Sequence, residues 1–181
     1  MVILSVALTA ALTAILTGGV AILTRKAKPK HIEGSVGVIS PGKVIAWITV
    51  ISGAMIMAGS IVFAIMAAQF LALIPAAVAC TLGAAIAGFM LPSLTSVHDI
   101  SWDATSMEGP CSLFGPTLGV PRTRLDFDTL VTTGKTTTGY WFVEATDGRR
   151  IYWSYLYNGY GELTKALKAR VPNLQLPADL G

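Results

Sequence analysis

The tetrapeptide Gly134–Thr137, GKTT, has the composition of a phosphate-binding loop. In a P-loop, a lysine and the backbone amides at the start of a helix hold the phosphates of a nucleotide. That motif also needs a glycine five residues before Gly134, where this chain has Thr129. The residues that follow favour a strand rather than a helix. We therefore interpret GKTT as a polar connection between strands and predict no bound cofactor.

Metal ligation and nucleophilic catalysis also lack a supporting pattern. His31 lies in a basic loop and His98 begins the polar half of the chain, and neither has a Cys or His partner at ligand spacing. We expect both imidazoles to be solvated. No nucleophile elbow accompanies a serine, and Cys80 and Cys111 are read as free thiols. The sequence therefore predicts no catalytic residue and no metal site.

Six basic residues are candidates for contacts with anionic lipid, each worth about 1 kcal/mol at a charged membrane surface. They are Arg25, Lys26, Lys28, Lys30, Arg149 and Arg150. The alternative for the first four is that they set the membrane topology, which needs the same residues. Residues 1–92 hold five basic residues and one acid, whereas residues 93–181 hold eight basic residues and nine acids. The basic excess is therefore one loop, and we expect no nucleic-acid partner.

Long uncharged stretches are the strongest signal in this sequence. Hydrophobic residues make up 53% of the chain and charged residues 13%, against about 25% charged in soluble domains. A bilayer-spanning helix needs about 20 apolar residues. We predict three such helices, at residues 2–24, 44–67 and 74–92, with a basic loop at 25–43. A signal peptide is the alternative for residues 2–24, but the basic cluster follows that segment instead of preceding it.

Small and hydroxyl residues recur along these predicted spans at the spacing of one helix face. Such faces let helices approach closely in lipid. The candidate packing residues are Thr9, Thr13, Thr17, Gly53, Ser60, Ala79, Gly83 and Ala87. For the threonines, a hydrogen bond back to their own helix is the alternative. None of the spans contains an ionisable residue, which argues against a proton relay or a transporter of charged substrates.

The basic loop at 25–43 also predicts an orientation. Lysine and arginine are retained on the cytoplasmic side of a membrane. The amino terminus is then outside, and three crossings place residues 93–181 in the cytoplasm.

Residues 93–181 read as a small α+β domain of antiparallel strands followed by one helix. The expected strands are 97–102, 111–114, 122–131, 139–145 and 150–155. Asp147-Gly148 between the last two is a strong hairpin signal, because glycine accepts the positive φ of a tight turn. The expected helix runs from about 159 to 170, with Asn158 as its cap and an apolar stripe for packing on the sheet.

This arrangement resembles the bacterial pleckstrin-homology-like (PH-like) domains that follow membrane helices. The segments that carry the resemblance are RLDFDTL, GYWFVEATDGRRIYW and GELTKALKARVPNL, within residues 96–174. It implies an antiparallel sheet or barrel closed by the carboxy-terminal helix, at the bacterial inner membrane. PH domains that grip inositol phosphates carry several basic residues in their early strands. Here those strands hold Arg122 and Arg124, which argues against that ligand.

These patterns favour a non-enzymatic integral membrane protein, an accessory or assembly subunit of a larger membrane complex. Its PH-like domain would dock onto other subunits, and aromatic residues on an outer sheet face would supply the surface, although most aromatics are expected in the core. One alternative is a module that binds anionic lipid. Another is a small membrane enzyme or transporter.

Overall fold

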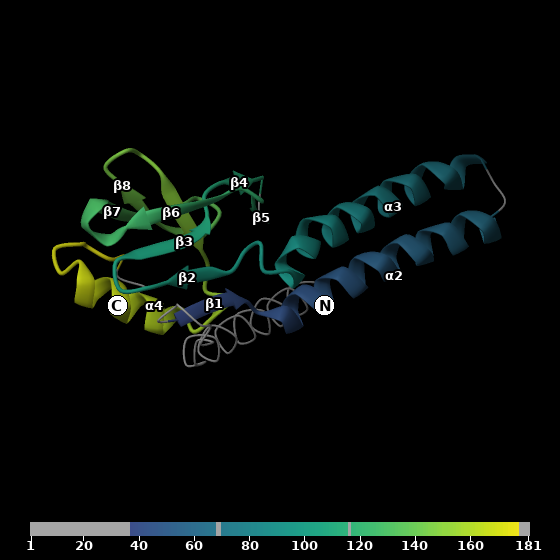
Figure 1. The fold of residues 1–181 in the computed structure, drawn as a ribbon. Helices are drawn as coiled ribbons and strands as arrows, with labels where there is room; N and C mark the ends of the chain where they lie inside the picture. Colours follow the sequence, from purple (N-terminus) through teal and green to yellow (C-terminus); the bar gives the residue numbers. More distant parts are fainter. Residues whose placement is uncertain (1–36, 68–69, 116, 178–181) are drawn as a thin grey trace, which may run out of the picture.

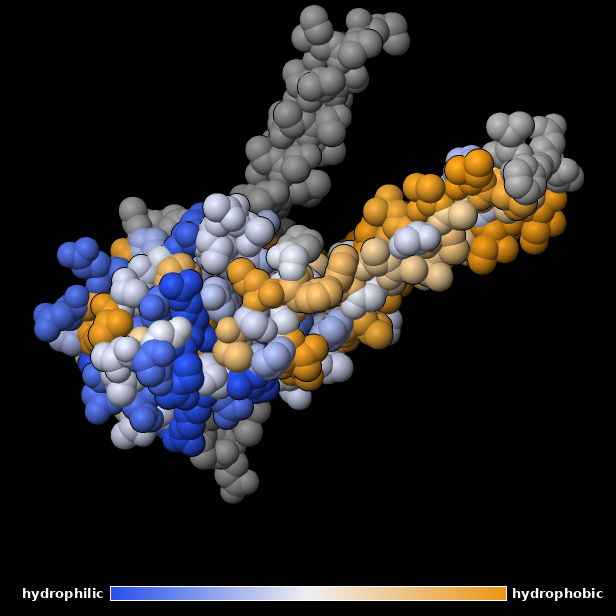
Figure 2. Space-filling view, turned by 90° about the horizontal axis from the view of Figure 1, so that it is seen from above, coloured by the Kyte–Doolittle hydropathy of each residue, from blue (hydrophilic) through white to orange (hydrophobic). Residues whose placement is uncertain are grey.

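The computed structural model describes residues 37–67, 70–115 and 117–177, which form a long helical hairpin joined to an α+β domain (Figure 1). The first predicted span, with Thr9, Thr13 and Thr17, lies outside the described residues. So does the basic cluster Arg25, Lys26, Lys28 and Lys30. Figure 2 shows the contrast in polarity between the apolar hairpin and the mixed polar surface of the domain.

Helices α2 (Lys43–Ala67) and α3 (Phe70–Met90) form the hairpin, and the 3-10 helix η1 (Leu91–Leu94) ends it. Two segments of the described chain, Lys43–Ala67 and Ala72–Leu94, are long and apolar enough to cross a membrane, and only 11% of an apolar 18-residue stretch in each is buried. A core helix of a soluble protein would be mostly buried. The helix α3 begins at Phe70, before the predicted start of the span at residue 74, and it contains Pro75, which transmembrane helices tolerate.

The small residues of the two spans pack α2 against α3. A Cβ added to Gly53 would lie 2.6 Å from the Gly83 carbonyl oxygen and 3.1 Å from the Ala87 Cβ. Gly53 and Ser60 are buried in α2. Gly53, Gly83 and Ala87 thus lie where α2 and α3 of this chain approach each other.

The domain is built from three antiparallel sheets, and the described residues form no closed barrel. The largest sheet has the order β10-β1-β2-β3-β6, the second β7-β8-β9 and the third β4-β5. Their bounds are β1 Gly37–Pro41, β2 Ile100–Trp102, β3 Ser106–Pro110, β4 Leu113–Phe114, β5 Thr117–Leu118, β6 Arg122–Asp126, β7 Leu130–Lys135, β8 Trp141–Ala145, β9 Arg150–Trp153 and β10 Tyr157–Asn158. The 3-10 helix η2 (Phe127–Thr129) divides the long strand expected at 122–131.

The position of β1 differs from the expected division of the chain, in which the domain begins at residue 93. Residues 37–41 were expected in a loop, but they pair with β2 on one side and β10 on the other. The hairpin is therefore inserted between two neighbouring strands of one sheet. Glycine is needed at position 37 because a Cβ there would lie 2.4 Å from the Trp102 ring.

Helix α4 (Tyr160–Arg170) covers the core, as its apolar stripe predicted. Leu163 and Leu167 are fully buried, and the Tyr160 ring lies 5.3 Å from that of Trp141. Gly159, with a φ of 86°, precedes the helix in place of the expected Asn158 side-chain cap. The predicted hairpin at 146–149 is confirmed by the antiparallel pairing of β8 with β9 and by a φ of 80° at Gly148.

Candidate functional site at the junction of the hairpin and the domain

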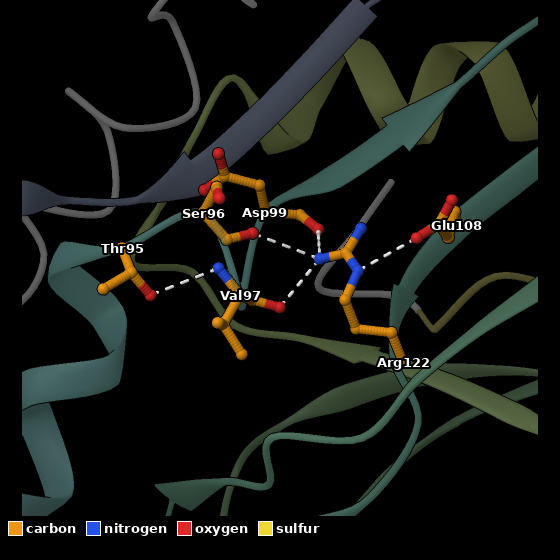
Figure 3. A network of polar contacts seen from close by, with 6 residues as sticks. All are labelled: Thr95, Ser96, Val97, Asp99, Glu108 and Arg122. Carbon is orange, nitrogen blue, oxygen red and sulfur yellow. Dashed lines mark hydrogen bonds and ion pairs between the residues drawn. The ribbon is translucent and has the colours of Figure 1, made fainter.

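Residues 95–99 carry the chain from η1 into β2, and Arg122 of β6 holds this connection in place (Figure 3). The Arg122 Nη1 donates to the backbone oxygens of Val97 and Asp99, both at 2.7 Å, and of Ser96 at 3.2 Å. Its Nε donates to Glu108 Oε1 at 3.0 Å. The side chain is 27% exposed, so these bonds are partly shielded from water and fix where the hairpin meets the sheet.

His98 is fully buried inside this connection, which corrects the expected solvated imidazole. Its Nδ1 lies 3.2 Å from Ser93 Oγ, and Nε2 makes no well-formed hydrogen bond to the residues that the structure describes. Burial is the largest influence and lowers the pKa of His98, while the Gly119 carbonyl opposes that shift and Arg122 adds to it. The imidazole is therefore held neutral.

Tyr157 of β10 ties the same connection to the far edge of the sheet. Its phenol donates to the backbone oxygen of His98 at 2.7 Å. Complete burial raises the pKa of Tyr157 well above its ordinary value, so the hydroxyl remains a donor at neutral pH. The chain leaving η1 is thus held from two strands, β6 and β10.

An open apolar groove lies beside this connection, between the end of α3 and the β4–β5 hairpin. Its volume is about 590 Å³. We name it the junction groove, and its lining residues are Ala85, Gly88, Phe89, Pro92, Ser112, Leu113, Phe114, Thr117, Leu118, Gly119, Val120 and Pro121. None of them is ionisable. Two of the lining residues, Phe89 and Phe114, are in tilted ring contact with centroids 5.9 Å apart.

A second surface feature is the outer face of β8 and β9, which we name the outer patch and define as Phe142, Arg150 and Tyr152. The Phe142 and Tyr152 rings lie 5.9 Å apart, and the Arg150 guanidinium lies 4.5 Å from the centre of the Phe142 ring. All three side chains are half-buried. Side chains alternate between the two faces along the predicted 139–145 strand. Trp141 and Val143 are buried in the core, so Phe142 between them lies on the outer face.

Arg149 and Arg150, predicted as lipid contacts, are both engaged within the domain. Arg149 pairs with Asp147 at 2.6 Å and donates to the Arg124 backbone oxygen. Arg150 pairs with Glu144 at 2.7 Å. These pairs neutralise the two charges, so this turn offers a membrane no unpaired cation.

The structure assigns no chemistry to the GKTT segment. Gly134 and Lys135 end β7, and a turn leads into β8, where a P-loop would need the start of a helix. Within the described ranges, no three His, Cys, Asp or Glu side chains gather in a way that could hold a metal ion. Cys80 and Cys111 are both free thiols.

Comparisons with known proteins place this chain in no group: no family model, curated protein or solved structure matches it.

Proposed function

We propose that this chain is a non-enzymatic membrane protein that acts as an accessory or assembly subunit of a larger membrane complex. In this proposal α2 and α3 cross the bilayer, and the α+β domain docks onto other subunits at the cytoplasmic surface. The observation that carries the proposal is the insertion of the hairpin between β1 and β2. Gly42 alone separates β1 from α2, and five residues, 95–99, separate η1 from β2.

Such a double connection gives the domain a fixed orientation relative to the hairpin. A single flexible linker would let the domain turn freely, whereas two short connections do not. Arg122 and Tyr157 both hold the 95–99 connection, and the Gly42 amide donates to the Leu156 backbone oxygen. A fixed orientation suits a docking role, because it lowers the entropy lost when a partner binds. The antiparallel strands followed by α4 also support the PH-like resemblance.

The outer patch is the surface that we propose for docking. Aromatic and arginine side chains are enriched among the residues that dominate protein interfaces. Inositol phosphates are less well supported as ligands, because Arg122 is paired with Glu108 and Arg124 with Asp103.

Affinity purification of the full chain in mild detergent, with mass spectrometry of what accompanies it, tests the proposal. We expect a stoichiometric membrane partner, and the paired change Phe142→Ala with Arg150→Ala should lower its recovery several-fold. Lys168→Ala, on the exposed side of α4, is the control and should leave recovery unchanged. Equal recovery of the partner with the wild type, the double variant and Lys168→Ala would refute docking at the outer patch. The lack of any partner would refute the subunit role.

A reporter fused after Gly181 tests the orientation separately. The structure joins residues 37–41, which lie within the predicted basic loop at 25–43, to the same sheet as the rest of the domain. The loop and the domain therefore share one side of the membrane in this proposal. We expect the reporter to be active in the cytoplasm, and periplasmic activity would overturn the orientation.

A further inference from the structure

We propose that the junction groove holds one acyl chain of a membrane phospholipid. This inference rests on the proposed membrane placement of α2 and α3, but not on the docking role of the domain. The junction groove lies at the end of a candidate membrane span, and part of its lining belongs to the polar domain.

The chemistry of the lining favours an alkyl chain. The twelve lining residues include no acid, base or amide side chain, and their side-chain polar atoms are the hydroxyls of Ser112 and Thr117. A peptide strand placed there would bury backbone N–H and C=O groups without enough partners, which is costly. An alkyl chain has no such groups to satisfy.

The groove also continues a stripe of α3 that is exposed in the hairpin. Val78 and Leu82 are 65% and 56% exposed, and Ala85 and Phe89 of the groove follow them at helical spacing on the same face. In a bilayer this stripe contacts acyl chains along its length. A chain lying against Val78 and Leu82 therefore reaches the groove without crossing a polar barrier.

The volume of the junction groove favours a lipid chain over a partner helix as its occupant. A helix with its side chains is about 10 Å or more across, so about 590 Å³ holds roughly five of its residues. The same volume lies within the range of about 300–1,000 Å³ that is typical of small-molecule sites. At the rim, Phe114 and Val120 are 66% and 59% exposed, as expected of apolar side chains that rest in the bilayer surface.

The test uses the full chain reconstituted in vesicles of phosphatidylcholine that carries a photoactivatable group on one acyl chain. After irradiation, labelled peptides are identified by mass spectrometry. We expect label on α2 and α3 and also on residues 112–121, which belong to the domain. Gly88→Trp should reduce the label on 112–121 several-fold, because a Cβ at Gly88 meets nothing within 4 Å and its side chain would fill the groove.

Gly59→Trp is the matched control, since Gly59 is also an exposed helical glycine with open space around its Cβ, but in α2 away from the groove. It should leave the label on 112–121 unchanged. Helices without label would refute the membrane placement itself. Labelled helices with an unlabelled 112–121 segment, or label that Gly88→Trp does not reduce, would overturn the groove inference and leave the membrane placement standing.

Discussion

The Arg122 guanidinium gathers three backbone oxygens of residues 96–99 and the Glu108 carboxylate around one partly buried side chain. Lysine cannot reproduce this fork, because its ammonium is a point charge on a flexible stem. We expect Arg122→Lys to lower the free energy of unfolding by about 2 kcal/mol, the scale of a hydrogen bond to a charged group. Chemical denaturation in detergent measures the loss, and hydrogen exchange at 96–102 should accelerate.

Arg124→Lys is the control for that measurement. Its ion pair with Asp103 is 3.0 Å long, but the Arg124 side chain is 61% exposed. Exposed pairs contribute about 0–1 kcal/mol, so this change should be nearly neutral. Equal losses from both substitutions would mean that Arg122 does not hold the connection.

His98 makes the stability of the domain depend on pH near neutrality. Burial lowers the pKa of His98 in the folded state, whereas an unfolded histidine takes up its proton near pH 6.5. Acid therefore favours the unfolded chain, and stability is lost as the pH falls below that value. We expect the thermal midpoint of the wild-type protein to fall between about pH 7.5 and about pH 5.5.

His98→Gln should flatten this dependence, because glutamine can still contact Ser93 but does not titrate. Ala169→Gln, at an exposed position of α4, serves as the control and should keep the wild-type slope. An unchanged slope in His98→Gln would show that another group is responsible. Should that variant fail to fold, NMR titration of the wild-type ring provides the second measurement. We expect His98 to be less protonated at pH 6.5 than a free imidazole, which is half protonated there.

At the scale of elements, local patterns predicted α2, α3, α4 and the β8–β9 hairpin, because each has its own periodicity or turn residues. They did not predict β1 or β3. Both strands contain glycines that large side chains cover: Gly37 lies under Trp102, and a Cβ on Gly109 would meet Ile100 and Ile151 at 2.8 Å. Those contacts join distant parts of the chain, so no local pattern reports them.

The α2–α3 interface predicts which small residues must remain small. A Cβ at Gly83 would lie 2.7 Å from the Gly53 carbonyl oxygen, so even Gly83→Ala must push the helices apart. We expect a lower thermal midpoint in detergent and a larger loss for Gly83→Leu. Gly59→Ala, in open space, should have no such effect. If Gly83→Leu retains the wild-type midpoint, the two helices do not pack at this point.

Helix α4 gives a second prediction at this scale. Leu163 and Leu167 are fully buried in the core, so Leu163→Asp or Leu167→Asp places a carboxylate where it has no partner. Each should destabilise the domain by several kcal/mol and unfold it. Ala169→Asp, at an exposed position of the same helix, should be tolerated. Circular dichroism and limited proteolysis of the full chain distinguish these outcomes, and a folded Leu163→Asp protein would show that α4 is not docked.

For the whole molecule, the insertion of the hairpin predicts how the chain can be divided. A fragment of residues 93–181 lacks β1, so β2 and β10 lose their common neighbour and expose unpaired edges. We expect that fragment to aggregate. A chain in which a short flexible linker replaces residues 43–94 keeps β1 and should be soluble and folded. Gel filtration compares the two, and a monomeric, folded 93–181 fragment would contradict the role of β1.

The position of β1 also sets an order of events during synthesis. The ribosome makes residues 37–41 first, then the whole hairpin, and only then the strands between which β1 must lie. Until β2 and β10 emerge, β1 has no neighbour, and the five-stranded sheet cannot close. In the proposed membrane setting, α2 and α3 enter the bilayer before the domain can fold. The sheet of the domain is therefore completed only after the whole hairpin and β10 have been synthesised.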